Sequence, residues 1–140
     1  MSEEEGIRGI LLAHGSMAVG LADAVRKISG VGPEVLIPIS NEGKSPQALE
    51  EEIARIMGNE PMILFTDLAS GSCAFAARRC SQGDCDQAVV SGVNLPILLD
   101  FVFNRHLPLG ELLPRLVEKG TGAMKTAPAF PRNADSSLPS

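Results

Sequence analysis

Apolar residues along this chain fall into short runs that alternate with stretches of helical periodicity. The first run covers residues 7–13 and stops at His14-Gly15. Apolar residues then recur every three to four positions from 17 to 28, and Gly30 follows them. A short apolar run indicates a buried strand, and the spacing after it indicates an amphipathic helix. Residues 7–28 therefore predict a strand, a turn and a helix.

The same unit repeats along the rest of the chain. Further strands are predicted over residues 35–39, 61–66 and 88–91, and further helices over 46–57, 74–79 and 96–102. Ser45-Pro46 indicates an N-cap followed by a proline at the first helical position. A last helix is predicted over 112–117, and Pro114 requires that helix to begin near it or to kink.

Strands that alternate with helices through short connections predict an α/β fold. We expect an open, doubly wound and mostly parallel sheet of about four strands, with helices on both faces. A chain of 140 residues suits one domain. We expect this domain over residues 1–125 and a flexible tail, rich in alanine, proline and serine, over 126–140.

Composition and charge narrow the class of partner. Hydrophobic residues make up 44% of the chain and charged residues 21%, which is typical of a soluble globular protein. The net charge of −5 does not suit a nucleic-acid backbone or an anionic membrane, so we expect small molecules or proteins as partners. The acidic start and the lack of an apolar run of about 18 residues predict a cytoplasmic location.

The cysteines do not predict a metal site. Cys73, Cys80 and Cys85 fit no common zinc spacing, and we expect reduced, mostly buried thiols. Cys73 stands near a predicted helix start, where a thiol can be reactive. Because no general base is evident for it, packing beside the site is its expected role.

Polar residues follow three of the predicted strands. His14 comes after the first strand, Asp67 after the third and Asn94 after the fourth, while Ser72 begins the third helix. Ligands of open α/β sheets collect at the carboxyl ends of the strands, where helix N-termini point N–H groups outward. We therefore expect these side chains to converge on one edge.

A neutral imidazole is a nucleophile when one ring nitrogen holds the proton and the other presents its lone pair. Asp67 is placed to fix that tautomer of His14 and to stabilise positive charge on the ring. Phosphoryl oxygens can be held by backbone N–H groups at two helix starts, Gly15-Ser16 and Gly71-Ser72. Asn94 is a further candidate to support the phosphoryl group.

Each of these residues also has a purely structural interpretation. A histidine after a strand can cap a helix, and Asp67, Ser72 and Asn94 can be turn or capping residues. Their shared position at successive strand ends favours the chemical interpretation. The other histidine, His106, lies in a charged loop that ends in proline, and we interpret it as a surface residue.

Three segments resemble the enzyme IIA domain of the mannose family of the bacterial phosphoenolpyruvate-dependent sugar phosphotransferase system. They are residues 10–15, residues 64–72 and, above all, the sequence Gly-Val-Asn-Leu-Pro of residues 92–96. The resemblance implies that His14 is phosphorylated by the histidine-containing phosphocarrier protein and passes the group to a separate IIB protein. It also implies that Asp67 orients His14 and that no cofactor is needed.

The resemblance further implies a homodimer that exchanges a C-terminal antiparallel strand, for which residues 121–126 are the candidates. The chain departs from the family over residues 69–74, where relatives commonly carry an aromatic residue, two glycines, and proline and phenylalanine after the serine. This departure leaves the identity of the docking partner open, because the loop borders His14.

Three other functions compete. Small chelatases of tetrapyrrole synthesis also place His-Gly-Ser after a first strand, but they need a second histidine that directs the metal, and His106 is a poor candidate. The phosphotransfer subunit of dihydroxyacetone kinase shares the fold, although residues 92–96 favour the mannose-type family. The third is a regulatory module whose partner affinity changes when His14 is phosphorylated.

Overall fold

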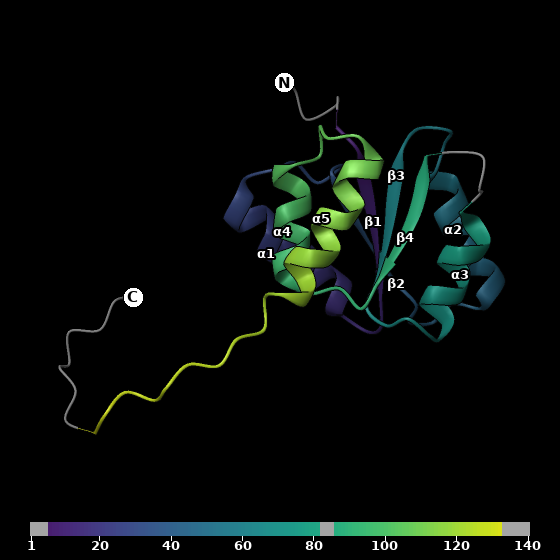
Figure 1. The fold of residues 1–140 in the computed structure, drawn as a ribbon. Helices are drawn as coiled ribbons and strands as arrows, with labels where there is room; N and C mark the ends of the chain where they lie inside the picture. The colour runs from purple at the N-terminus through teal and green to yellow at the C-terminus, as the bar shows by residue number, and fades with distance from the viewer. Residues whose placement is uncertain (1–5, 82–85, 133–140) are drawn as a thin grey trace.

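The structure is a computed structural model that describes residues 6–81 and 86–132. Its centre is a four-stranded parallel sheet with the strand order β2-β1-β3-β4 (Figure 1). The strands are β1 Arg8–Ala13, β2 Leu36–Ser40, β3 Met62–Thr66 and β4 Gln87–Ser91. Cys85 and the tail from 133 lie outside the described residues.

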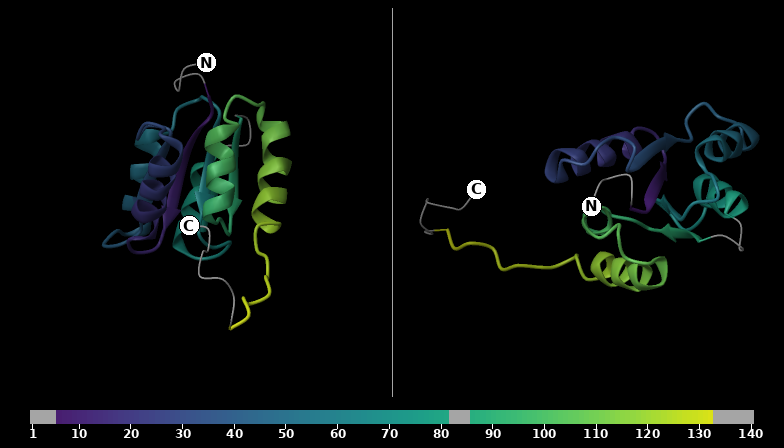
Figure 2. Two further views of the ribbon diagram at one scale, coloured as in Figure 1. Left: turned by 90° about the vertical axis from the view of Figure 1, so that its left-hand side faces the viewer. Right: turned by 90° about the horizontal axis from the view of Figure 1, so that it is seen from above.

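Five helices cover the two faces of the sheet. They are α1 Met17–Ser29, α2 Pro46–Ile56, α3 Ser72–Cys80, α4 Leu95–Phe103 and α5 Leu109–Thr121. α1, α4 and α5 pack on one face, and α2 and α3 pack on the other (Figures 1 and 2). The expected open, doubly wound α/β fold is confirmed.

The strands are apolar along their middles because both faces of the sheet are covered. Leu11 and Phe65 face the layer of α1, α4 and α5, whereas their neighbours Leu12 and Leu64 face α2 and α3. All four side chains are fully buried. Gly9 lets the core close over β1, since a Cβ there would lie 3.0 Å from a ring carbon of Phe65.

Local signals position several helix ends as predicted. The Ser45 side chain accepts a hydrogen bond from the Ala48 N–H at 3.1 Å, and Pro46 opens α2. Gly30 ends α1 in the left-handed region with φ of 80°. In α5, however, Pro114 lies inside a helix that already starts at Leu109. Pro114 is the sixth residue of this helix and lacks the N–H that would bond to the Gly110 carbonyl, yet α5 continues through it to Thr121.

Beyond α5 the chain leaves the domain. Residues 123–132 form neither helix nor strand and run away from the sheet (Figures 1 and 2). Thr121 closes α5 instead of starting the expected strand, so strand exchange stays a prediction. In the part of the chain that the structure describes, no helix has both the length and the apolar character needed to cross a membrane.

Candidate functional site

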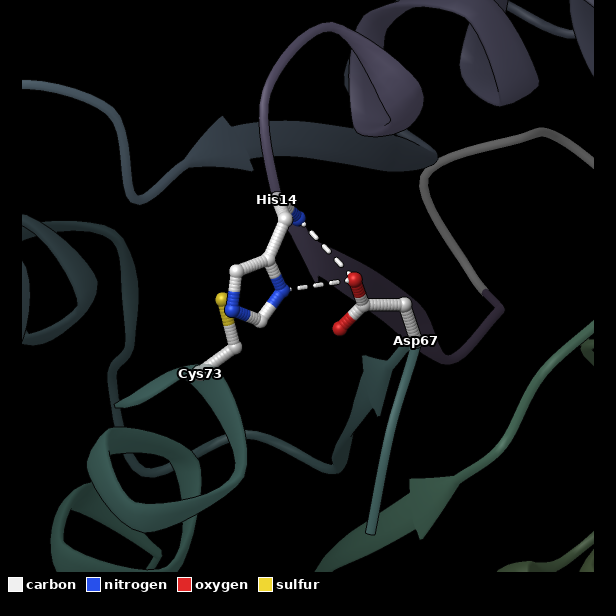
Figure 3. A group of neighbouring side chains, drawn as sticks. All are labelled: His14, Asp67 and Cys73. Atoms are coloured by element: carbon white, nitrogen blue, oxygen red, sulfur yellow. Dashed lines mark hydrogen bonds and ion pairs between the residues drawn. The ribbon is translucent and has the colours of Figure 1, made fainter. Parts of the chain in front are cut away.

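The topological switch point of the sheet lies between β1 and β3. From β1 the chain adds β2 on one side, and then β3 and β4 follow on the other side. The loops after β1 and β3 therefore lead to helices on opposite faces, which is the place where open α/β sheets bind ligands. His14 follows β1 directly and Asp67 follows β3, so they meet at these carboxyl ends (Figure 3).

His14 and Asp67 are joined by two hydrogen bonds to one carboxylate oxygen. The ring Nδ1 of His14 lies 2.8 Å from Oδ2 of Asp67, and the backbone N–H of His14 donates to the same oxygen at 3.0 Å. The N–H of Leu68 donates to Oδ1 at 3.0 Å. Because an ionised carboxylate can only accept, Nδ1 carries the proton, and in the neutral ring Nε2 presents its lone pair.

The two partners differ sharply in exposure. The side chain of His14 is 44% exposed, whereas that of Asp67 is 8% exposed. Burial by itself raises the pKa of Asp67, but the N–H groups and the charge of His14, together with the Leu68 N–H, lower it below the usual value. The carboxylate therefore stays ionised near neutral pH while the ring faces solvent.

The free side of the imidazole borders the start of α3. Gly71 has φ of 94°, and a Cβ on it would lie 3.9 Å from Nε2 of His14. Gly71 is the residue before the helix, and Ser72 is its first residue, so Ser72 is not the N-cap. The first N–H groups of a helix lack partners within the helix and favour anions. The start of α3 can therefore receive anionic oxygens near Nε2.

The last residue of β2 and the first residue of the loop after it were both missed by the sequence interpretation. The hydroxyl of Ser40 donates to the Gly15 carbonyl at 2.8 Å. The side chain of Asn41 accepts from the Gly15 N–H at 3.4 Å and donates to the hydroxyl of Ser72 at 3.5 Å. The same strand-end rule pointed to this loop, because β2 adjoins β1 and also ends at this edge. Asn41 thus bridges the His14 loop and α3.

Gly15 and Ser16 form the turn between β1 and α1. Gly15 has φ of 60°, a left-handed value that favours glycine, and Ser16 is the exposed residue before α1. The turn points His14 out of the sheet and brings the start of α1 to the site. The phosphoryl-binding roles of Gly15, Ser16, Gly71 and Ser72 stay predictions.

Asn94 uses both ends of its side chain to join helices. Its Oδ1 accepts from the Ile97 N–H at 3.1 Å, which caps α4, and its Nδ2 donates to the Gly120 carbonyl of α5 at 3.0 Å. The structure therefore gives Asn94 a structural role at the edge where β4 ends. Its support of a phosphoryl group stays a prediction.

Cys73 packs beside the site, as expected. Its side chain is fully buried in the first turn of α3. Burial and the charge of Asp67 raise the pKa of this thiol. His106 is exposed as expected, and it lines a cavity of about 460 Å³ near Ile7, at the opposite end of β1 from His14. It is therefore not a second histidine for a chelatase site.

The sequence of residues 9–116 matches the family described as PTS system fructose IIA component. The fold is similar to phosphotransferase system component EIIA from Streptococcus agalactiae, with a TM-score of 0.79 and 22% identity over 86% of this chain and 96% of that one. It is also similar to the mannose/sorbose specific IIA subunit from Enterococcus faecalis, with a TM-score of 0.78 and 22% identity over 92% and 99%.

A third similar structure is the PTS IIA protein associated with the fucose utilization operon from Streptococcus pneumoniae. Its TM-score is 0.69 and its identity 20%, over 87% of this chain and 94% of that one. No curated protein matches the chain. At these identities the similar structures show only that the fold is shared. The match over residues 9–116 shows membership of the family.

Proposed function

The chain belongs to the family of PTS system fructose IIA components, and we propose that it carries a phosphoryl group on His14. In this proposal Nε2 of His14 accepts the group from the histidine-containing phosphocarrier protein and passes it to a IIB protein. The cytoplasmic location predicted from the sequence belongs to the same proposal.

The observation that carries the proposal is the bond between His14 and Asp67. A carboxylate 2.8 Å from Nδ1 holds the proton on that nitrogen and leaves Nε2 as the nucleophile on an exposed ring. Asp67 is nearly buried, so water screens its charge weakly. It can therefore stabilise the positive ring that forms when Nε2 is phosphorylated.

The transfer breaks one nitrogen–phosphorus bond and forms another. The lone pair of Nε2 attacks phosphorus, and the donor's ring nitrogen leaves with the electron pair of the broken bond. Nδ1 keeps its proton throughout, and Asp67 balances the charge on the ring. In the second step a nucleophile of the IIB protein attacks phosphorus, and Nε2 leaves with its electron pair. In this proposal the N–H groups that begin α3 hold the phosphoryl oxygens, because the first N–H groups of a helix favour anions.

The test mixes the chain with phosphoenolpyruvate, enzyme I and the histidine-containing phosphocarrier protein. We expect an acid-labile phosphoryl adduct of one group per chain. His14→Ala should abolish the adduct. The matched control is His106→Ala, which changes the exposed histidine at the opposite end of β1 and should retain the adduct. An adduct that survives His14→Ala, or no adduct with cognate partners, would refute the proposal.

A second experiment, which follows the phosphoryl group after His14 has been labelled, distinguishes a phosphoryl carrier from a regulatory module. Adding a cognate IIB protein to the phosphorylated chain should discharge His14 and label the IIB protein. A phosphorylated chain that instead keeps its label, but binds a partner with altered affinity, would favour the regulatory function.

The homodimer is part of the proposal and rests on two features. β4 lies at an edge of the sheet, and exposed strand edges invite pairing with another strand. The segment after α5 runs away from its own domain, and Met124 on it is 92% exposed. If this segment paired with the β4 edge of a second copy, the dimer would cover both the strand edge and Met124. The family resemblance implies such a strand exchange for residues 121–126.

A further inference from the structure

Three side chains of the kinds that bind metals meet beside His14. His14 comes from the loop after β1, Asp67 from the loop after β3 and Cys73 from the first turn of α3 (Figure 3). One nitrogen, one oxygen and one sulfur from these side chains all lie within 4.8 Å of one another. The phosphoryl relay uses the imidazole and the carboxylate, but it gives the thiol no task.

We propose that His14, Asp67 and Cys73 form a binding site for a thiophilic divalent cation such as Zn²⁺, and that the bound cation excludes phosphorylation of His14. The cation is a reversible ligand here and not a resident cofactor. The binding half of this inference stands on the side chains alone, and only the inhibitory half rests on the proposed function.

The donor set selects the kind of cation. Thiolate, imidazole and carboxylate are the ligands of zinc sites, whereas Mg²⁺ and Ca²⁺ prefer oxygen alone. In a tetrahedral zinc site, bonds of about 2.0–2.3 Å place ligand atoms roughly 3.5 Å apart. The three donor atoms lie within 4.8 Å of one another, so binding a cation requires them to move closer together. Because the side chain of His14 is 44% exposed, solvent can fill the fourth position.

Binding displaces one proton. Burial keeps the thiol of Cys73 protonated in the absence of a cation. When the cation binds, the S–H proton leaves to solvent and the thiolate sulfur donates its electron pair to the metal. The double positive charge then offsets both the buried thiolate and the carboxylate of Asp67.

Either coordination mode removes the nucleophile. A cation on Nε2 occupies the lone pair that would attack phosphorus. A cation on Nδ1 leaves the ring proton on Nε2, which then has no lone pair to offer. Metal binding and phosphorylation therefore compete for the same ring, and each must weaken the other.

The binding test is a titration of the unphosphorylated chain with Zn²⁺ by calorimetry and with Co²⁺ by absorption spectroscopy. We expect one tight site per chain and a thiolate-to-cobalt charge-transfer band. Cys73→Ser should lose the band and bind at least about tenfold more weakly. The matched control Cys80→Ser changes the cysteine that ends α3, and it should keep the charge-transfer band and the affinity of the wild type. No tight site, or equal binding by Cys73→Ser, would overturn the inference.

The functional test measures phosphorylation of His14 with and without Zn²⁺. Each variant is compared with its own metal-free rate, and labelling of the phosphocarrier protein is followed to show that the donors still work. Zn²⁺ should slow the wild type and Cys80→Ser, and the concentration for half inhibition should rise at least about tenfold in Cys73→Ser. Tight binding without inhibition would overturn the exclusion, whereas failure of the proposed function would appear as no phosphorylation even without metal.

Discussion

The reactivity of His14 depends on a contrast between two neighbouring side chains. A histidine that meets other proteins must reach solvent, yet the carboxylate that orients it acts most strongly when water is kept away. In this chain the ring is 44% exposed and the carboxylate 8% exposed. Three N–H groups from His14 and Leu68 hold Asp67 in place. The carboxylate can therefore be buried and still remain ionised.

Replacing Asp67 by asparagine should slow phosphorylation of His14. The substitution keeps the shape of the side chain but removes the charge that fixes the tautomer and stabilises the phosphorylated ring. We expect a rate lower by on the order of 10²–10⁴-fold, as measured by quenched-flow labelling with the phosphocarrier protein. The far-UV circular dichroism spectrum should be unchanged. A rate equal to that of the wild type would remove Asp67 from the mechanism.

Asp67 should also make stability depend on pH in acid. Its pKa is lower in the folded chain than the usual value, so the unfolded chain binds this proton more readily. The stabilisation is then complete above the unfolded-state pKa of about 3.9, and it is lost as the pH falls through the folded-state pKa. Urea unfolding should show the advantage of the wild type over Asp67→Asn shrinking below about pH 4. An advantage that grew in acid would contradict the sign of this shift.

Gly71 should not tolerate a side chain. Its φ of 94° and ψ of −175° lie in a region that is essentially restricted to glycine, where other residues cost about 1–3 kcal/mol. Gly71→Ala should lower the free energy of unfolding by about that amount and slow phosphorylation, since the new Cβ lies beside Nε2. The matched control is Gly20→Ala in α1, where nothing lies within 4 Å of the new Cβ. That variant should be more stable by up to about 1 kcal/mol.

At the scale of elements, the site is built from the ends of three adjacent strands and the starts of two helices. His14 follows β1, Asp67 follows β3, and Asn41 in the loop after β2 joins Gly15 to Ser72 of α3. α1 and α3 begin at this edge, on opposite faces of the sheet. Two helix dipoles thus point their positive ends toward this edge of the sheet, which favours an anionic group there.

Asn94 should contribute mainly to the joint between α4 and α5. Removing its side chain loses the cap of α4 and the bond to Gly120. Asn94→Ala should lower the free energy of unfolding by about 1–3 kcal/mol in denaturant titrations. The control Ser45→Ala, which removes only the cap of α2, should cost about 1 kcal/mol. Unchanged stability of Asn94→Ala would contradict the structural role, and its phosphorylation rate measures any further role at the site.

At the scale of the whole molecule, the core lies between one sheet and the two helical layers that cover it. The segment after α5 lies outside this core. Residues 124–132 are all exposed and do not pack on their own chain. Met124 in particular makes an apolar side chain available at 92% exposure. This side chain is available to pack against a second copy of the chain.

The proposed dimer should therefore depend on this segment. Light scattering after size exclusion should give twice the mass of one chain for the wild type, and Met124→Asp should shift the equilibrium toward the single chain. The exposure of Met124 means that the substitution leaves the fold of each chain intact. A control is Phe130→Asp, which lies beyond the predicted exchanged strand and should remain dimeric. A wild type that is a single chain at all concentrations would contradict strand exchange.

Sequence alone determined the features that depend on neighbouring residues. The apolar runs of the four strands, the Ser45-Pro46 start of α2 and the end of α1 at Gly30 are local, because hydrophobic periodicity and capping act within a few positions. The position of His14 after a strand was readable for the same reason. The start of α5 was not, because Leu109 has no local capping signal and tertiary packing decides where that helix begins.

Only the tertiary structure decided which strand ends meet. The order β2-β1-β3-β4 brings Asp67 to His14 across 53 positions of sequence and places Asn41 between Gly15 and Ser72. The same order leaves Asn94 to join two helices and sets the thiol of Cys73 within 4.8 Å of the imidazole and carboxylate. Strand order follows from how the helical layers pack over the whole sheet, and no local pattern records it.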